Sequence, residues 1–321
     1  MIYKSIFFLL VMIALGVNYS GHSVQGELKD VPKRAYDITI SFSGDAMVHT
    51  PQISVARTAD GKLDFHRSFV NIAPLWKSVD FAVVNFETTI SHNGKYSGYP
   101  MFSSPIEFAQ ALADAGVDVA ALANNHICDR GARGLDNTID QLNHLGVKTY
   151  GAHKNTETDT ILYIKKYPFK VAMLNYTYGT NGMPVPNGKI VHHIDTTIIA
   201  QHIDKAKAQN ATHIIVFYHW GNEYQLKANT SQQNLAMWSR KRGADVVIGS
   251  HPHVVQPADY DNSIVYSLGN LISNQQDEQT KLGQTAVITI NNYTGPNVNI
   301  VNHLNNVHEN NPKLRYVLEV I

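Results

Sequence analysis

The sequence is poor in cysteine and in charge. Cys128 is the only cysteine among 321 residues, so no internal disulfide can form and the hydrophobic core must hold the fold unaided. We interpret Cys128 as a small buried hydrophobic side chain rather than as a ligand. Charged residues make up 16% of the chain, below the ~25% usual in soluble domains. The 26 Lys and Arg balance the 26 Asp and Glu, which argues against a nucleic-acid partner because such proteins carry a basic excess.

Long hydrophobic runs are lacking as well. The apolar stretch from Ile6 to Val17 has the length of a signal-peptide core and falls short of the ~18–20 residues that span a bilayer. Gly21 and Ser23 suit the small-residue positions before a cleavage site. We therefore expect residues 1–23 to be a signal peptide, with an N-terminal membrane anchor as the alternative. The protein is expected to be exported, to the periplasm or to the outer face of the cytoplasmic membrane.

Short apolar runs alternate with amphipathic segments along the rest of the chain. The runs are rich in Val, Ile, Phe or Tyr and are bounded by turn formers, which is typical of buried strands. They begin at Tyr36, Asp80, Gly116, Lys170, Thr212, Ala244 and Ser263. Amphipathic helices are expected over 104–116, 134–146 and 231–243. This alternation predicts one α/β domain over 36–290 with a largely parallel or mixed sheet. Residues 291–321 are expected to be an Asn-rich, loop-like C-terminal extension that ends in a last strand.

The strand-like runs share a feature at their C-terminal ends, where most carry residues that bind metals or transfer protons. These are Asp45, Asn85, Glu87, Asn124, Asn125, His126, His219, His251 and His253. In open α/β sheets ligands bind beyond the carboxyl ends of the strands, because loops from different strands converge there. We therefore expect these side chains to meet at one site, bordered by the Gly-, Pro- and Asn-rich loop Thr177–Lys189.

The pair His251 and His253 illustrates the expected geometry. Pro252 between them biases His251 towards an extended backbone. In an extended backbone residues i and i+2 point the same way. Both imidazoles are therefore expected to face one ion.

The donor set restricts the metal. Imidazole nitrogens with carboxylate and amide oxygens suit Zn, Mn or Fe, whereas a soft metal would need a thiolate cluster. We assign as metal ligands Asp45, Glu87, Asn125, His219, His251 and His253. This set is too large for one tetrahedral ion and sufficient for two ions that share a carboxylate. Two ions ~3.5–4 Å apart promote displacement at phosphorus, and His126 is the candidate catalytic acid for the leaving group.

Several motifs occur together in a fixed order between about residues 38 and 275. They read SGDAM, NFETTIS, ALANNHICDRG, FYHWGNEY, GSHPHVVQP and YSLGN. In these motifs the chain resembles the CapA family of poly-γ-glutamate capsule synthesis proteins, a branch of the calcineurin-like metallophosphoesterase superfamily. The resemblance implies a metallophosphatase-like layered β-sandwich flanked by helices, with a dinuclear site at the strand ends.

The first half of the superfamily pattern is matched only in part. Asp45 matches the Asp of the opening Asp-x-His, but Met47 stands in place of its His. Either Glu87 or Asn85 stands in place of the bridging Asp. The later motifs are matched more fully, by Asn125 and His126, by His219, and by His251 and His253. The departure at Met47 leaves open a site with two ions, a site with one, or a site used only for binding.

Two functions follow from the resemblance. The first is an exported metal-dependent hydrolase of poly-γ-glutamate capsule synthesis or export, acting on a phosphoester or on a γ-glutamyl substrate. We assign to substrate binding Asn85, Asn124, Glu223 and Tyr224. The alternative is a non-catalytic component that binds the anionic poly-γ-glutamate chain and partners a membrane-embedded capsule synthase.

Overall fold

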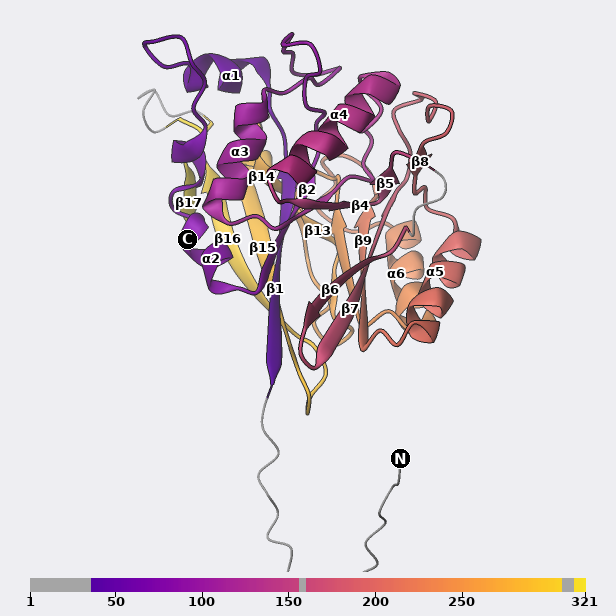
Figure 1. Ribbon diagram of the computed structural model, residues 1–321. Helices are drawn as coiled ribbons and strands as arrows, with labels where there is room; N and C mark the ends of the chain where they lie inside the picture. Colours follow the sequence, from indigo (N-terminus) through magenta and orange to yellow (C-terminus); the bar gives the residue numbers. More distant parts are fainter. Residues whose placement is uncertain (1–35, 156–159, 308–314) are drawn as a thin grey trace, which may run out of the picture. The chain divides into compact units, whose positions relative to one another are not determined.

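The computed structural model describes residues 36–155, 160–307 and 315–321 (Figure 1). Residues 1–23, expected to be a signal peptide or an anchor, lie outside the described residues. No helix in the described part of the chain is long and apolar enough to cross a bilayer. The described residues form two main sheets with helices against their outer faces. This arrangement confirms the predicted α/β class and the layered β-sandwich flanked by helices.

The first sheet has eight strands and is mixed. Neighbours from β1 to β4 run parallel, and β14 pairs in parallel with the end of β1. On the other side of β1 the neighbours are antiparallel. The order is β17 (Leu318–Val320), β16 (Asn297–Asn305), β15 (Leu282–Asn291), β1 (Asp37–Ala46), β2 (Phe81–Phe86), β3 (Val119–Ala121) and β4 (Lys148–Tyr150), with β14 (Asn270–Ile272) off this path.

The second sheet has five strands, of which the edge strand β6 is antiparallel to its neighbour and the others are parallel. The order is β12 (Ile264–Val265), β10 (Val246–Ser250), β9 (His213–His219), β7 (Phe169–Thr177) and β6 (Leu162–Lys166). Two small antiparallel pairs accompany it, β11 (Val255–Gln256) with β13 (Ser267–Leu268), and β5 (Ala152–His153) with β8 (Ile190–Val191).

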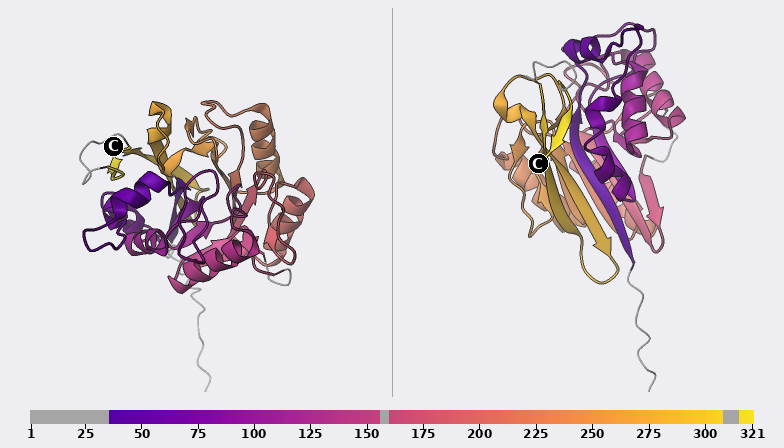
Figure 2. Two further views of the ribbon diagram at one scale, coloured as in Figure 1. Left: turned by 90° about the horizontal axis from the view of Figure 1, so that it is seen from above. Right: turned by 90° about the vertical axis from the view of Figure 1, so that its left-hand side faces the viewer.

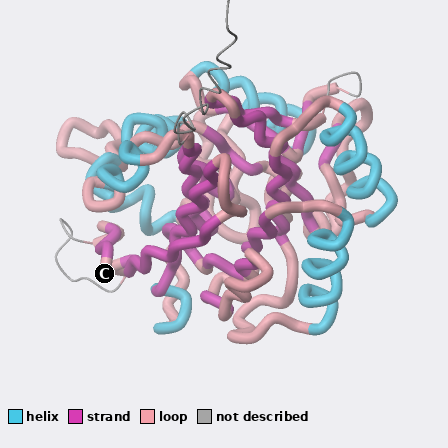
Figure 3. The backbone as a smooth tube through the Cα atoms, turned by 90° about the horizontal axis from the view of Figure 1, so that it is seen from below, coloured by secondary structure: helices cyan, strands magenta, loops and turns pink. Residues whose placement is uncertain are grey.

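The core between the sheets comes from alternate residues of the strands. Ile38, Ile40 and Phe42 of β1 belong to it, because successive side chains of a strand point to opposite faces. Phe42 meets Phe217 of β9 edge to face, with ring centroids 5.8 Å apart. Figures 2 and 3 show the strands in the middle of the fold and the helices at its sides.

The helices cover both outer faces. Over the first sheet lie α1 (Thr50–Ala56), the 3-10 helix η1 (His66–Phe69), α2 (Ala73–Ser78), α3 (Ile106–Ala115) and α4 (Gly131–His144). Over the second lie α5 (Thr196–Ala208) and α6 (Thr230–Arg242), and α7 (Glu278–Lys281) precedes β15. Gly116 ends α3 with φ 113° and Gly243 ends α6 with φ 120°, a region in which glycine carries no Cβ penalty. The expected helices over 104–116, 134–146 and 231–243 are present with shifted ends.

The prediction of a loop-like run after Asn291 is wrong. Strand β16 occupies Asn297–Asn305 and pairs with β15 along its length. Val298 and Ile300 alternate with asparagines and pack against the core between the sheets. The asparagines made the segment read as a loop. A strand can nevertheless carry polar side chains on its exposed face, because its ladder hydrogen bonds are formed by the backbone. Strand β15 was likewise not among the predicted runs.

Candidate metal centre

The predicted ligands meet at the carboxyl ends of strands from both sheets. Asp45 lies at the end of β1, Glu87 follows β2 and His219 ends β9. His251 and His253 follow β10. All five side chains are buried. The sandwich therefore gathers residues that are up to 208 positions apart in sequence.

Glu87 is shared by two groups of ligand-type atoms. One group joins Glu87 to His219 and His251, and the other joins it to Asp45 and His253. In each group the ligand atoms lie within 4.8 Å of one another. A carboxylate common to two groups can bridge two neighbouring ions.

Asp45 and Asn270 orient His253. Nδ1 of His253 lies 3.1 Å from Oδ2 of Asp45 and 3.0 Å from Oδ1 of Asn270. Both partners are acceptors, so the ring proton sits on Nδ1 and Nε2 is left to bind a metal. That Nε2 is 4.0 Å from Oε1 of Glu87. Gly44, next to Asp45, allows the backbone of β1 to lie against Gly269. A Cβ on Gly44 would lie 1.9 Å from the carbonyl oxygen of Gly269.

Asn85 connects the two groups of ligand-type atoms through its side-chain amide. Its Nδ2 donates to Oδ1 of Asp45 at 2.7 Å and lies 3.1 Å from Nδ1 of His219. Asn124 in turn donates to the carbonyl oxygen of Phe86 at 2.9 Å. Asn85 and Asn124 are buried, and neither lines the cavity described below. The structure thus places these two residues, assigned to substrate binding, in the network that supports the ligands.

Burial dominates the charge balance of the cluster. It raises the pKa of Glu87 well above its usual value, and the neighbouring carboxylate of Asp45 adds to the effect. Burial, followed by the neighbouring His251, lowers the pKa of His219 well below its usual value. Burial and His253 lower the pKa of His251 to about 3. For Asp45 burial alone would raise the pKa, but the hydrogen bond and charge of His253 hold it well below its usual range.

Within the cluster, two buried ligand-type atoms have no hydrogen-bond partner among the described residues, Oε1 of Glu87 and Nδ1 of His251. Leaving a buried polar atom unpaired costs roughly 1–3 kcal/mol. A divalent cation would satisfy both atoms and would offset the energetic cost of an ionised Glu87. The residues present therefore fit a metal centre built from nitrogen and oxygen donors.

The two histidines after β10 reach the site by a different backbone from the one expected. The prediction of an extended backbone at His251 is wrong, since His251 has φ 99° and His253 has φ 59°. Their rings nevertheless lie 5.9 Å apart, centroid to centroid. Left-handed backbone at a non-glycine residue costs energy and is concentrated at functional sites. Pro252 separates two such turns rather than extending a strand.

Asn125 and Tyr178 close the side of the site next to His219. Oδ1 of Asn125 lies 3.0 Å from Nε2 of His219. The Tyr178 ring stacks on His219 at 6.2 Å and lies 4.5 Å from the ring of His251. Nδ2 of Asn125 donates to the Tyr178 hydroxyl at 3.4 Å. The loop after β7 therefore borders the site, as its composition predicted.

His126 forms a buried pair with Asp129. Nδ1 of His126 lies 2.8 Å from Oδ2 of Asp129, and the backbone N–H of Phe102 donates to the same oxygen at 2.7 Å. With Nδ1 held in this way, Nε2 is the ring nitrogen left for a substrate. Sequence reasoning missed Asp129. The available signal was an aspartate three residues after His126, the histidine that ends the Asn-Asn-His string.

A cavity of about 220 Å³ opens beside the cluster. Its walls are Met47, His49, Tyr99, His126, Glu223, Tyr224, His253 and Gln275. Glu223 and Tyr224 were assigned to substrate binding, and both line it. Glu223 also brings a carboxylate oxygen within 4.8 Å of ligand atoms of His251 and His253. His49 was given no role from the sequence, although it faces this cavity.

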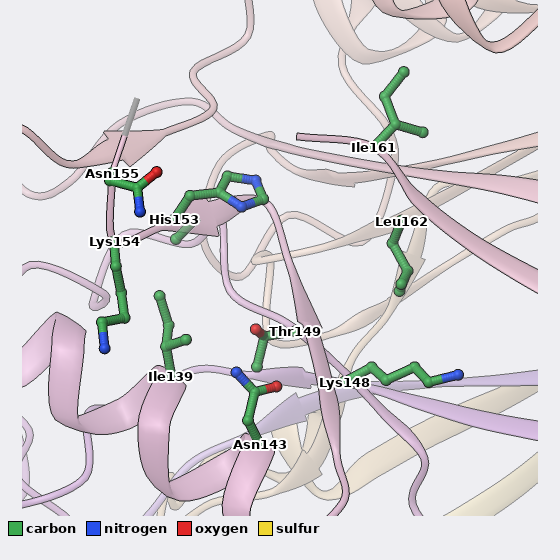
Figure 4. Close-up of a pocket in the computed structure, with 10 residues that line it drawn as sticks. Ile139, Asn143, Lys148, Thr149, His153, Lys154, Asn155, Ile161 and Leu162 are labelled. Carbon is green, nitrogen blue, oxygen red and sulfur yellow. The ribbon is translucent and has the colours of Figure 1, made fainter. Parts of the chain in front are cut away.

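A larger cavity of about 490 Å³ lies elsewhere, beside α4 and β4 (Figure 4). None of the predicted site residues lines it. Lys154, at its edge, is paired with Asp140 at 2.7 Å, and Lys148 lies over the Phe81 ring at 5.8 Å. We therefore do not assign the candidate site to this cavity, although it is the larger of the two.

The layered sandwich and its cluster of carboxylates and histidines place the chain in the metallophosphatase-like class. Among solved structures it is similar to the NAD nucleotidase NadN of Haemophilus influenzae, with a TM-score of 0.50 and 11% identity over 84% of this chain and 56% of that one. That similarity concerns the fold. The model of the family described as bacterial capsule synthesis protein PGA_cap matches residues 39–275. The chain belongs to this family, which confirms the resemblance seen in its motifs.

Two curated relatives are named for biosynthesis, one of a capsule and the other of PGA. The capsule biosynthesis protein CapA of Bacillus anthracis is 32% identical over 228 residues, which cover 66% of this chain and 55% of that protein. The PGA biosynthesis protein CapA of Bacillus subtilis (strain 168) is 28% identical over 255 residues, 76% of this chain and 65% of that protein. The chain thus spans between about half and two thirds of the length of the curated relatives it matches.

Proposed function

We propose that this chain is a metal-dependent hydrolase of poly-γ-glutamate capsule synthesis, acting on a phosphoester or on a γ-glutamyl substrate. The observation that carries the proposal is the position of Glu87, which belongs to two groups of ligand-type atoms. One group contains His219 and His251, and the other contains Asp45 and His253. This sharing supports two divalent ions, with Mn, Zn or Fe suited to the donors. The relatives' names supply the capsule context.

The chain's own residues would divide the chemistry between two sides of the cavity. Two bound ions would polarise the scissile phosphoryl or carbonyl group and lower the pKa of water near them. His126, facing the same cavity, would donate a proton from Nε2 to the leaving oxygen or nitrogen. Asp129 would hold the ring by its bond to Nδ1 and stabilise the protonated imidazole before the transfer. The cluster and the His126–Asp129 pair together support hydrolysis more directly than either would alone.

We further propose that the protein acts outside the cytoplasm and partners a membrane-embedded capsule synthase. The support for export is the apolar stretch from Ile6 to Val17 after a single lysine, Lys4. The support for a synthase partner is the naming of two relatives for capsule and PGA biosynthesis.

One observation favours the alternative of a non-catalytic polyglutamate-binding component. Met47 is 2% exposed and lines the cavity where the superfamily pattern has a histidine ligand. A missing ligand weakens one of the two ion positions. The alternative predicts affinity for poly-γ-glutamate without turnover, and affinity that falls as salt rises.

The test is hydrolysis by the full chain loaded with Mn²⁺, Zn²⁺ or Fe²⁺. The substrates are p-nitrophenyl phosphate, bis(p-nitrophenyl) phosphate and γ-glutamyl p-nitroanilide. His126→Ala is compared with His144→Ala, because His144 is exposed at the end of α4. We expect turnover in wild type and in His144→Ala, and a loss of about a hundredfold or more in His126→Ala. Equal turnover in all three proteins, or none with any substrate despite bound metal, would overturn the hydrolase.

A further inference from the structure

The cavity beside the cluster has no basic side chain in its walls. Among the described residues that line it there is no lysine or arginine, and Glu223 is the one carboxylate. Glu223 is exposed at the cavity edge, with an oxygen near ligand atoms of His251 and His253. A substrate carboxylate placed beside Glu223 would therefore meet a like charge, with no lysine or arginine in the cavity wall to offset it.

Tyr224 and Tyr99 form the outer part of this cavity. Tyr224 is 47% exposed and Tyr99 is 73% exposed. Tyr224 has φ 64°, and its backbone N–H donates to the carbonyl oxygen of Pro252 at 2.8 Å. The Gln275 amide donates to its hydroxyl at 3.3 Å. The phenol of Tyr224 can both donate and accept a hydrogen bond.

His49 adds an uncharged imidazole to the inner wall. Its Nδ1 receives the backbone N–H of Asn274 at 3.2 Å and lies 3.2 Å from Oε1 of Gln52. Nε2 is therefore the nitrogen left for a ligand. The ring packs edge to face on Phe102, with centroids 5.1 Å apart, and Phe102 packs in the same way on His126. Burial lowers the pKa of His49 to about 4, so this side chain is neutral near pH 7.

We propose that this cavity binds an uncharged, hydroxyl-bearing part of the substrate, next to the group held at the metal centre, and rejects a second carboxylate there. The inference rests on the proposed function, because it describes the part of the substrate that does not react. Of the two substrate classes it fits the phosphoester, since every unit of a γ-glutamyl chain carries a carboxylate. A carboxylate such as Glu223 accepts hydrogen bonds from hydroxyl groups, and phenol, amide and imidazole groups both donate and accept. The Tyr99 and Tyr224 rings offer apolar faces to the carbon skeleton.

The inference is tested with two ligands that differ only in this part. The phosphonate analogues of glycerol phosphate and of phosphoglycerate share one anionic head, cannot be hydrolysed, and end in a hydroxymethyl group or a carboxylate. Their dissociation constants for the Mn²⁺-loaded full chain are measured by calorimetry beside methylphosphonate. We expect the carboxylate analogue to bind roughly tenfold more weakly than the hydroxyl analogue, or about 1.4 kcal/mol.

The outcomes separate the inference from the proposed function. If methylphosphonate binds and the carboxylate analogue binds as tightly as the hydroxyl analogue, the inference is overturned and the metal centre stands. If none of the three ligands binds the metal-loaded protein, the anion-binding metal centre fails, and the inference fails with it.

A charge placed in the wall gives a second readout. Tyr99→Lys introduces a cation at an exposed position, and Tyr99→Gln is the matched neutral control. We expect Tyr99→Lys to tighten the carboxylate analogue severalfold relative to the hydroxyl analogue, and Tyr99→Gln to leave their ratio unchanged. The same shift in both variants would count against a charge-selective cavity.

Discussion

Nδ1 of His126 and Oδ2 of Asp129 lie 2.8 Å apart in a buried pair whose other end faces the candidate metal centre. The carboxylate fixes the ring proton on Nδ1, and the backbone N–H of Phe102 fixes the carboxylate. His126 is therefore held in one orientation before a substrate arrives. Asp129 is a positioning residue in this arrangement, since it acts through the imidazole.

Asp129→Asn should lower kcat by about a hundredfold or more while leaving metal content unchanged. The neutral amide can donate to Nδ1 but does not stabilise the protonated imidazole as the carboxylate does, so His126 loses the form that gives its proton to the leaving group. KM should change little, because Asp129 does not line the cavity. Cys128→Ala, a neighbouring buried substitution, is the control, and a matching loss there would indicate a packing effect.

Glu87→Gln should abolish metal binding and yet stabilise the metal-free protein at pH 7. The folded-state pKa of Glu87 is raised above its usual 4.5. Stability from this group is therefore fully present below pH 4.5 and is lost as pH rises towards the folded-state pKa. Removing the carboxylate should recover about 1–3 kcal/mol at pH 7, seen as a higher Tm in chelator.

The gain from Glu87→Gln should shrink as pH falls below 4.5, where the wild-type carboxyl becomes protonated in both states. Glu319→Gln on the exposed strand β17 controls for the general loss of a negative charge. A variant that keeps its metal, or that is less stable than wild type at pH 7, would remove Glu87 from the centre of the site.

The sequence allowed the members of the buried cluster to be predicted because they share one local rule, a polar residue at or just after the C-terminal end of a buried strand. Asp45, His219 and His253 all obey it and meet in the structure. His49 and Asp129 do not obey it. His49 lines the cavity from the loop after β1, and Asp129 contacts His126 from the turn after β3. Phe102 packs against the imidazoles of His49 and His126, and its backbone N–H donates to Asp129. These contacts join distant segments, and no local sequence pattern encodes them.

The fold was predictable to a similar extent. The inner faces of β1 and β9 read as apolar runs, so both strands were expected. β16 was missed because its apolar residues, Val298 and Ile300, are separated by asparagines and only partly buried. The left-handed backbone at His251 was also beyond the sequence, because a non-glycine residue adopts it only under tertiary constraint.

Acid should destabilise the protein through its buried neutral histidines, and His303 isolates this effect. Burial lowers the pKa of His303 from 6.5 to about 4, and Nε2 lies 3.2 Å from the Asn270 carbonyl oxygen. A depressed folded-state pKa contributes stability that is present above pH 6.5 and is lost as pH falls towards 4. The loss for this one group is at most about 3 kcal/mol.

His303→Gln should therefore flatten the dependence of unfolding free energy on pH between about 6.5 and 4, relative to wild type. Urea unfolding in chelator at several pH values measures this slope. His144→Gln, at an exposed position, should leave the slope as it is. An unchanged slope in His303→Gln would show that His303 takes up its proton over the same pH range in the folded and the unfolded protein, and would contradict the prediction.

The double variant His251→Ala/His253→Ala should remove most of the bound metal, and the wild-type stoichiometry should report how many ions the site holds. Each histidine belongs to a different group around Glu87, one with His219 and the other with Asp45. Losing both leaves each group one ligand short, because only carboxylate and His219 donors remain. Metal content by mass spectrometry of the purified protein should fall from near two equivalents to well below one.

Near one equivalent in wild type would locate the loss at Met47, which faces the cavity without a donor suited to Zn, Mn or Fe. In that case Met47→His should restore the second equivalent. No metal in wild type after reconstitution would contradict the hydrolase and leave the shared position of Glu87 without a chemical role.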